Sequence, residues 1–144
     1  MSLVPAVADR FLGALAARDY PTLASCFGEG ARFHALVPRG LREAIGADEA
    51  TSYFQRWFGA ADRVELLASG AESVVERCHL SWRFRVHDEA GWQVIEQQAY
   101  ASIQDGQIVR MDLLCSGFLP MASPEGALEQ STTTSDETAF ARQA

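Results

Sequence analysis

The pattern of apolar and polar residues divides the chain into a helical first part and a strand-rich second part. Up to about residue 58, apolar positions recur at helical spacing, as in Val7, Phe11, Leu12 and Leu15. From about residue 63 the period changes to two, which is typical of half-buried strands. The order of these patterns predicts an α+β fold, with the helices packed on one face of a curved sheet.

The expected helices cover residues 5–16, 22–27 and 48–58, and Asp48 is a suitable N-cap for the third. One strand is expected at 31–37, and four more are expected at 63–68, 73–86, 92–103 and 107–114. Turns are expected at Ser69-Gly70, at 87–91 and at Asp105-Gly106. The Asp-Gly pair between two β-runs is the strongest hairpin signal in the chain.

The strand expected at 92–103 carries polar residues in its middle. Side chains alternate between the two faces of a strand, so Trp92, Val94, Glu96, Gln98 and Tyr100 share one face. If this face is buried, the acid and the amide need partners, because an unpaired buried polar group costs roughly 1–3 kcal/mol. We expect these even-numbered side chains to face a closed pocket, where a ligand is one possible partner.

Length and charge limit the classes of function. The 144 residues suit one domain, and the formal charge of −7 with a pI of about 4.9 argues against nucleic-acid binding. No apolar run is long enough to span a membrane, and the N-terminus lacks the features of a signal peptide. Three scattered cysteines, Cys26, Cys78 and Cys115, predict neither a disulfide framework nor a metal site, so we expect a cytoplasmic protein.

Several segments together resemble the nuclear transport factor 2-like superfamily. They are Arg10-Phe-Leu-Gly-Ala-Leu-Ala-Ala-Arg-Asp-Tyr, Leu23-Ala-Ser-Cys-Phe, Ala31-Arg-Phe-His, Gly46-Ala-Asp-Glu-Ala with Tyr53-Phe and Trp57-Phe, and Asp105-Gly-Gln-Ile-Val-Arg. This superfamily includes ketosteroid isomerase, limonene-1,2-epoxide hydrolase, scytalone dehydratase and the SnoaL-like polyketide cyclases. The resemblance implies a cone-shaped fold over residues 1–120, with a deep pocket and a homodimer through the outer face of the sheet. Residues 121–144 are rich in Ser, Thr, Ala and Glu, and we expect a disordered tail there.

The functional residues of the better-known members are mostly replaced in this chain. By this resemblance, Phe11 stands at the position where ketosteroid isomerase has a tyrosine that donates a hydrogen bond to the oxyanion. The position of its catalytic aspartate falls near His34. The position of the second oxyanion donor of ketosteroid isomerase falls on Gln98. The epoxide hydrolases and cyclases have an aspartate at the end of the last strand, and the matching position here is around Ser116. The resemblance therefore implies the fold, without implying steroid isomerisation or epoxide hydrolysis by the known aspartate machinery.

Three residues are candidates for catalysis. Gln98 could hold a carbonyl or enolate oxygen, or it could bond a neighbouring side chain. Glu96 in an apolar pocket would have a raised pKa and could act as an acid or base, or it could pair with Arg83 or Arg85. His34 could shuttle a proton, although strict alternation turns it away from the pocket unless a β-bulge intervenes.

Aromatic and sulfur-containing residues are candidates for ligand contacts, because small-molecule sites are usually apolar cavities with a few polar groups. The candidates are Tyr53, Trp57, Trp82, Phe84, Trp92, Tyr100, Met111 and Cys115. Three histidines without ligand spacing predict no metal, and no cofactor motif is present. Asp112 is expected to pair with Arg110 or with an arginine on an adjacent strand.

Two classes of function fit these observations. One is a cofactor-independent isomerase or cyclase, which acts on an apolar polyketide-like molecule by acid/base catalysis and by holding the substrate in a reactive shape. The other is a binding or accessory protein that uses the same pocket without chemistry. An epoxide hydrolase-like activity is a weaker alternative, as is an adaptor that works through its dimer face.

Overall fold

The computed structural model describes residues 4–121, so the tail expected at 121–144 lies almost wholly outside the described residues. The helices are α1 (Ala6–Ala17), α2 (Tyr20–Ser25) and α3 (Ala47–Phe58). The strands are β1 (Phe27–Val37), β2 (Gly40–Ile45), β3 (Arg63–Val74), β4 (Arg77–Asp88), β5 (Gly91–Gln104), β6 (Gln107–Cys115) and β7 (Leu119–Pro120).

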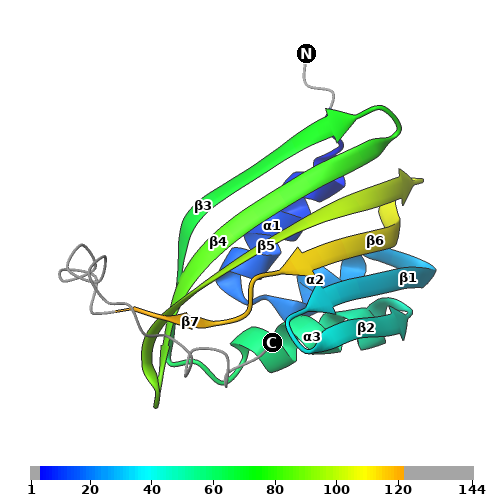
Figure 1. Ribbon diagram of the computed structural model, residues 1–144. Coiled ribbons are helices and arrows are strands. Elements are labelled where there is room, and N and C mark those ends of the chain that lie inside the picture. The colour runs from blue at the N-terminus through cyan, green and yellow to red at the C-terminus, as the bar shows by residue number, and fades with distance from the viewer. Residues whose placement is uncertain (1–3, 122–144) are drawn as a thin grey trace.

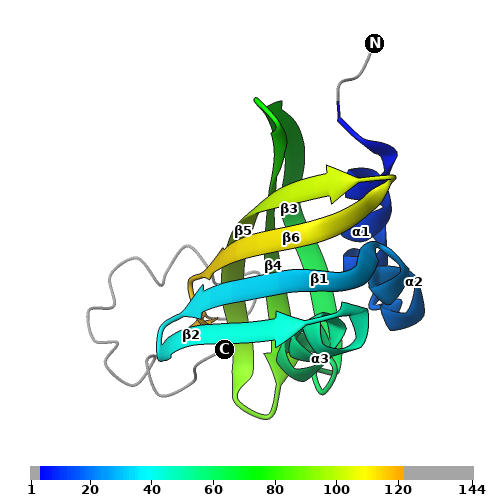
Figure 2. The same ribbon diagram turned by 90° about the vertical axis from the view of Figure 1, so that its right-hand side faces the viewer.

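One mixed sheet organises the molecule, in the strand order β2-β1-β6-β5-β4-β3, with β7 added beside β5. Strands β1 and β6 run parallel, and the other neighbours run antiparallel. The sheet is strongly bent, and the three helices lie against its concave face (Figures 1 and 2). This arrangement confirms the predicted α+β fold, with helices on one face of a curved sheet.

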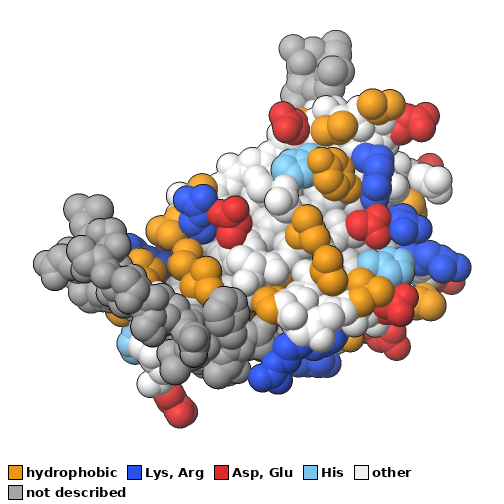
Figure 3. Space-filling view, in the orientation of Figure 1, with side chains coloured by type: hydrophobic (Ala, Val, Ile, Leu, Met, Phe, Trp, Pro, Cys, Tyr) orange, Lys and Arg blue, Asp and Glu red, His pale blue; other side chains and the backbone are white. Residues whose placement is uncertain are grey.

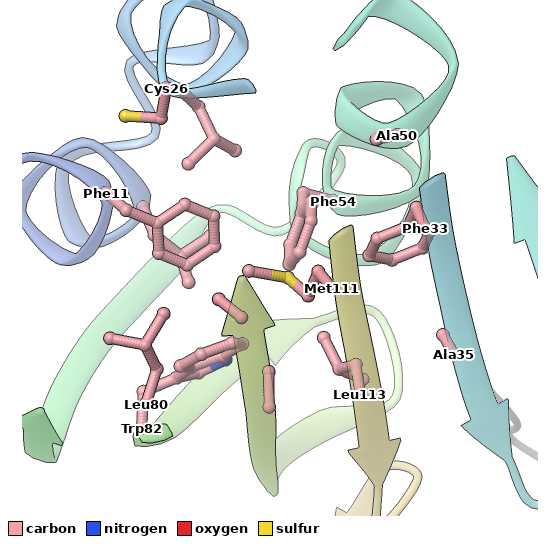
Figure 4. Packing of buried hydrophobic residues seen from close by; sticks show 14 of the residues in the cluster. Phe11, Cys26, Phe33, Ala35, Ala50, Phe54, Leu80, Trp82, Met111 and Leu113 are labelled. Atoms are coloured by element: carbon pink, nitrogen blue, oxygen red, sulfur yellow. The ribbon is translucent and has the colours of Figure 1, made fainter. Parts of the chain in front are cut away.

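Aromatic side chains fill the space between the helices and the concave face of the sheet (Figure 4). Phe11 of α1 is fully buried, and its ring lies 5.7 Å from the ring of Phe54 and 5.6 Å from that of Trp82. Aromatic pairs in tilted or edge-to-face arrangements contribute about 0.5–1.5 kcal/mol beyond the burial of their area. The core therefore joins α1, α3 and β4 through one cluster of rings.

A side chain at the end of α1 joins this helix to the chain that follows α3. Arg18 ends α1 in the left-handed conformation, with φ of 54°. Its guanidinium donates hydrogen bonds to the backbone carbonyls of Phe58, at 2.9 Å, and Ala61, at 2.7 Å. The Phe58 carbonyl belongs to the last turn of α3 and has no partner within that helix, while Ala61 lies beyond its end, so the arginine fixes the start of the path toward β3.

The turns and caps differ in part from those expected. The Asp105-Gly106 turn is confirmed, and both residues have positive φ, as a type I′ hairpin turn requires. The turn expected at Ser69-Gly70 is wrong, because β3 continues through it to Val74. Helix α3 begins at Ala47 and has Gly46 as its N-cap, so the expected capping role of Asp48 is also wrong. Strand β2 was not expected from the sequence.

Candidate functional site

Strand β5 presents the opposite face to the interior from the one predicted. Its buried side chains are the odd-numbered ones, among them Gln93, Ile95 and Gln97. Glu96 and Gln98 are exposed on the convex, outer face of the sheet. The prediction that the even-numbered residues of this strand face a closed pocket is therefore wrong.

A β-bulge in β6 explains the reversal. Ile103 of β5 pairs with Ile108, but Ser102 pairs with Arg110, so Val109 is an extra residue in β6. A shift of one residue exchanges the two faces of a strand. Met111 and Leu113 of β6 are buried as the family register predicted. Their β5 partners are consequently odd-numbered residues rather than Gln98 and its neighbours.

The interior contains a short chain of hydrogen bonds across three strands. Trp82 Nε1 of β4 donates to Gln97 Oε1 of β5 at 2.8 Å, and Gln97 Nε2 donates to Cys115 Sγ of β6 at 3.2 Å. Trp82 donates to the oxygen of the amide, so the amide group has a defined orientation, with its NH₂ toward Cys115. Gln97 is only 1% exposed, and a buried amide of this kind is costly without such partners.

The inner polar groups are neutral. Burial raises the pKa of the Cys115 thiol, although hydrogen bonds from Gly117 N–H and Gln97 act in the opposite direction. A thiol with a raised pKa is a weak nucleophile at neutral pH. Among residues 4–121, the buried polar side chains are Thr51, Gln93 and Gln97, and none of the buried side chains is a carboxylate or an imidazole.

The two strand residues expected to be catalytic are paired on the outer face. Glu96 Oε1 accepts a hydrogen bond from Arg83 Nε at 2.7 Å, which is the alternative considered for this acid. Gln98 Oε1 lies 2.8 Å from His79 Nε2. Both contacts are exposed, and a shallow hollow of about 230 Å³ lies beside them, lined by Glu96, Gln97, Gln98, Leu114, Cys115 and Ser116.

His34 also lies on the outer face, as strict alternation along β1 indicates. Its neighbours Phe33 and Ala35 are buried, and its ring stands between Glu43 of β2 and Asp112 of β6. Asp112 forms the expected ion pair with Arg110.

The carboxylate of Asp112 also accepts a hydrogen bond from Arg77 Nη2 of β4 at 2.7 Å. Partial burial alone would raise the pKa of Asp112. Hydrogen bonds and charge attraction from Arg110 and Arg77 outweigh this effect and hold its pKa below the usual value. This network is therefore a set of mutually neutralised charges on the surface of the sheet.

The candidate ligand contacts divide between the two faces. Four of them are buried in the core and two are half-buried at its margin, while Trp92 and Tyr100 lie on the outer face, contrary to the prediction. Trp92 lies against the guanidinium groups of Arg63 and Arg85, each 5.6 Å from its ring. The buried four are Trp57, Trp82, Phe84 and Met111, and the half-buried two are Tyr53 and Cys115.

A larger hollow, of about 610 Å³, lies near the tip of the β4–β5 hairpin. Asp62, Asp88 and Glu89 line it together with His87, whose Nδ1 lies 2.9 Å from Asp62 Oδ1. Within residues 4–121, no group of three or more metal-ligating side chains is placed to hold a metal ion. No helix in the same part of the chain is long and apolar enough to cross a membrane.

Geometry and sequence comparison agree on the class of protein. A sheet curled around three helices, with a neutral apolar interior, is the nuclear transport factor 2-like fold. A family profile for the SnoaL-like domain matches residues 8–111, and the chain belongs to this family. No curated protein matches the sequence.

Solved structures with the same fold share little sequence with this chain. A hypothetical protein with a ketosteroid isomerase-like fold from Catenulispora acidiphila, crystallised with trimethylamine, has a TM-score of 0.64 and 11% identity over 91% of this chain and 95% of its own. A protein named "putative polyketide cyclase" from Xanthomonas campestris has a TM-score of 0.62 and 18% identity over 75% of this chain and 86% of its own. At these identities the likeness establishes the fold alone.

Gln97 is an inward polar residue that sequence reasoning missed, as is Gln93. One signal could have identified it. In β4 the apolar residues Leu80, Trp82 and Phe84 alternate clearly, and a two-residue turn at 89–90 pairs Trp82 with Gln97. Counting from β4 rather than from the last hairpin places the odd-numbered residues of β5 inside.

Proposed function

We propose that this protein binds an apolar small molecule at the concave side of its sheet and that it does so without acid/base chemistry. The supporting observation is that no carboxylate or imidazole is among the buried side chains of residues 4–121. Proton transfer in an apolar site requires a titratable group within hydrogen-bond reach of the ligand. Glu96 and His34, the predicted proton carriers, lie on the other side of the sheet.

The margin of the core is the region that we assign to the ligand. Tyr53 of α3 and Cys115 of β6 are half-buried, and both adjoin fully buried residues. The ring of Tyr53 stacks on Phe33 at 5.7 Å and lies 5.9 Å from that of Trp57. An apolar ligand beside Tyr53 would meet these aromatic rings, and one beside Cys115 would meet the amide of Gln97.

The chemistry of Gln97 suggests what the ligand carries. Its Nε2 donates to a sulfur atom, and sulfur is a weak acceptor. A ketone, ether or hydroxyl oxygen placed beside Cys115 would be a stronger acceptor for this group. We therefore assign to the ligand an apolar frame with one oxygen acceptor, a description that includes polyketide-like molecules.

A matched pair of probes tests this assignment. The ketone 2-acetylnaphthalene and the hydrocarbon 2-ethylnaphthalene have similar shapes, and their binding can be followed by tryptophan fluorescence. We expect the ketone to bind about fivefold to tenfold more tightly, which corresponds to roughly 1 kcal/mol for one hydrogen bond. Gln97→Leu should remove this preference, and the outer-face variant Glu96→Gln should keep it. Failure of both probes to bind, or a preference unchanged in Gln97→Leu, would contradict the proposal.

A cyclase that acts by shaping its substrate is the second candidate. Membership of the SnoaL-like family favours it, and holding a flexible chain in a reactive shape needs few catalytic side chains. If such turnover exists, Glu96→Gln, Gln98→Leu and His34→Gln should each retain it. A loss of more than tenfold in any of them, with the fold intact, would restore acid/base catalysis as the better explanation.

We further propose that the protein is a homodimer through the outer face of the sheet. Leu41, Leu36 and Leu114 occupy one row across β2, β1 and β6, and they are 55%, 50% and 51% exposed. Charged side chains on this face are joined in ion pairs, such as Arg83 with Glu96 and Arg110 with Asp112, so much of its charge is balanced on a chain of charge −7.

Figure 3 looks onto this side of the molecule, where apolar, basic and acidic side chains are intermixed. A neutral face with an apolar strip can pack against its own copy without the repulsion expected between acidic surfaces. Sedimentation should show a dimer that Leu114→Glu converts to a folded monomer, whereas Leu66→Glu, at the edge strand β3, should leave it intact. A monomeric wild-type chain would contradict the proposed dimer without contradicting the proposed ligand binding.

The three free thiols suit a reducing compartment such as the cytoplasm.

A further inference from the structure

Strand β3 is the longer of the two edges of the sheet. It spans 12 residues, Arg63–Val74, whereas β2 at the opposite edge spans 6. Within residues 4–121, β4 is the strand that pairs with β3, and no strand lies along its far side (Figure 1). The backbone N–H and C=O groups along such an edge are a template for pairing with another strand.

The side chains of β3 restrict which strand can pair with it. Apolar residues are exposed on both faces, with Leu66 on the inner face 43% exposed and Val74 on the outer face 39% exposed. The strand contains neither lysine nor proline, which commonly protect an edge. It contains three charged residues instead, Arg63, Glu65 and Glu72. A strand brought beside β3 has to match these charges.

A β-bulge in β3 determines which of its residues share a face. The pairing of β3 with β4 skips Leu67, which is therefore an extra residue. Before this bulge the odd-numbered residues of β3 lie on the outer face of the sheet, and after it the even-numbered ones do. Arg63, which pairs with His87, and Glu72, which pairs with His79, consequently lie on the same face.

The charges of β3 are complementary to those of a second β3 in one register. A two-fold axis perpendicular to the sheet sets two copies of the strand antiparallel, and opposite residues then share a face. In one such register Arg63 lies opposite Glu72 of the second copy, and symmetry repeats this pair at the other end. A shift of two residues in one direction sets Glu65 opposite Glu72, and like charges directly opposite each other are destabilising. The same shift in the other direction sets Arg63 opposite Gly70 and removes both pairs.

We propose that β3 pairs with β3 of a second copy in the Arg63–Glu72 register, which joins two molecules into one continuous sheet. The contact is independent of the proposed ligand site and of the proposed dimer through the outer face of the sheet. Where that dimer also forms, the two contacts together give assemblies larger than a dimer. Contact along a single strand buries little area, so we expect a weak association with a dissociation constant of about 100 µM.

Charge reversal tests the register. In Arg63→Glu each end of the pairing holds two acidic residues, and in Glu72→Arg each end holds two basic ones. Either variant alone should therefore associate about tenfold more weakly than the wild type. An equimolar mixture of the two variants restores opposite charges at both ends and should associate about as strongly as the wild type. Sedimentation equilibrium of the full chain, from about 1 µM to about 1 mM, measures these constants.

Glu76→Arg is the matched control, because it makes the same change of charge in the turn after β3, outside the paired residues. It should associate as the wild type does, and circular dichroism should show that the variants are folded. If Arg63→Glu is unfolded, the comparison of Glu72→Arg with Glu76→Arg still decides, because the proposal requires a loss in the first and none in the second.

Two results would overturn the inference and leave the outer-face dimer standing. One is a wild-type chain that shows no mass above that dimer at the highest concentration. The other is a mixture of the two reversed variants that associates no more strongly than its components. Leu114→Glu separates the two contacts, because an association that persists in this variant and follows the pattern of charges supports the edge contact without the outer-face dimer.

Discussion

The two faces of β4 and β5 hold their polar side chains in different ways. On the inner face, Trp82 and Gln97 are neutral, fully buried and joined by one hydrogen bond. On the outer face, directly next along each strand, Arg83 and Glu96 are charged, half-exposed and joined by an ion pair. The same backbone therefore supports a neutral interior and a surface of balanced charge.

This difference separates two capacities of the molecule. A neutral interior can bind an apolar ligand and orient it, but its groups do not change charge near neutral pH. The outer face holds charged side chains joined in ion pairs, such as Arg83 with Glu96 and Arg110 with Asp112. Variants that act on one face and spare the other can test the separation.

The largest effect on stability is expected from removing a buried aromatic ring on the inner face. Phe11→Ala removes a fully buried ring that contacts Phe27, Phe54 and Trp82. Loss of a buried phenylalanine side chain lowers the free energy of unfolding by about 3–5 kcal/mol. Chemical denaturation measures the change, and Leu36→Ala on the outer face should alter the unfolding of the monomer far less. Equal losses in the two variants would show that the outer leucine is also removed from water, as it would be in the proposed dimer.

The next effect is expected from the inner hydrogen bond. Trp82→Phe leaves Gln97 Oε1 without its donor, and an unsatisfied buried group costs about 1–3 kcal/mol. Trp92→Phe on the outer face is the control and should cost less. Adding Gln97→Leu to Trp82→Phe should recover part of the loss, because both polar partners are then gone. A double variant that loses the full sum of the single effects would argue against coupling between the two residues.

A smaller effect is expected from the outer carboxylate with the lowered pKa. The folded-state pKa of Asp112 lies below its ordinary value of 3.8, so its stabilising effect is present above that value. The effect is lost as the pH falls through the folded-state pKa. Asp112→Asn should lower the free energy of unfolding by about 1 kcal/mol or less at neutral pH, since the group is one-third exposed.

In strong acid the free energies of unfolding of Asp112→Asn and of the wild type should become equal. Urea unfolding at a series of pH values measures the difference, and Glu89→Gln, in the exposed hairpin turn, provides a carboxylate control. A constant difference between Asp112→Asn and the wild type at every pH would point to lost packing instead of lost charge.

The smallest effect is expected at the exposed ion pair. Glu96→Gln removes the charge that faces Arg83, and exposed pairs contribute about 0.2–1 kcal/mol. The melting temperature of the monomer should change little, and high salt should reduce the change further. A loss above about 2 kcal/mol would indicate that Glu96 is desolvated, for example by a partner in the assembly.

Much of the fold could be predicted because its signals are local. The helical spacing of Val7, Phe11 and Leu15 and the Asp105-Gly106 turn each report on a few neighbouring residues, and both predictions are confirmed. Strand β2 was missed because it is a short edge strand in which Leu41 and Ile45 face outward, so its apolar residues do not mark a buried face. The turn after β3 was misplaced because Gly70 lies within the strand, while Val75 adopts positive φ.

The candidate site was harder to predict because it depends on register. Strand β5 has apolar and polar residues on both faces, with Gln93 and Gln97 inside and Trp92 and Tyr100 outside. Its own sequence therefore does not decide which face is buried. The pairing with β4 decides it, whereas an inference from β6 fails because Val109 is an extra residue there, and a bulge of this kind has no clear signal in a single sequence.

The extra residue at Val109 also matters for any attempt to align distant relatives with this chain. At identities of 11–18%, inferring the inward face of β5 from the buried residues of β6 without allowing for Val109 would match Gln98 with side chains that occupy the inside of another protein's cone. Roles would then be transferred to residues on the wrong side of the sheet. Alignments anchored on the apolar alternation of β4 avoid this error, because that strand pairs with β5 without interruption.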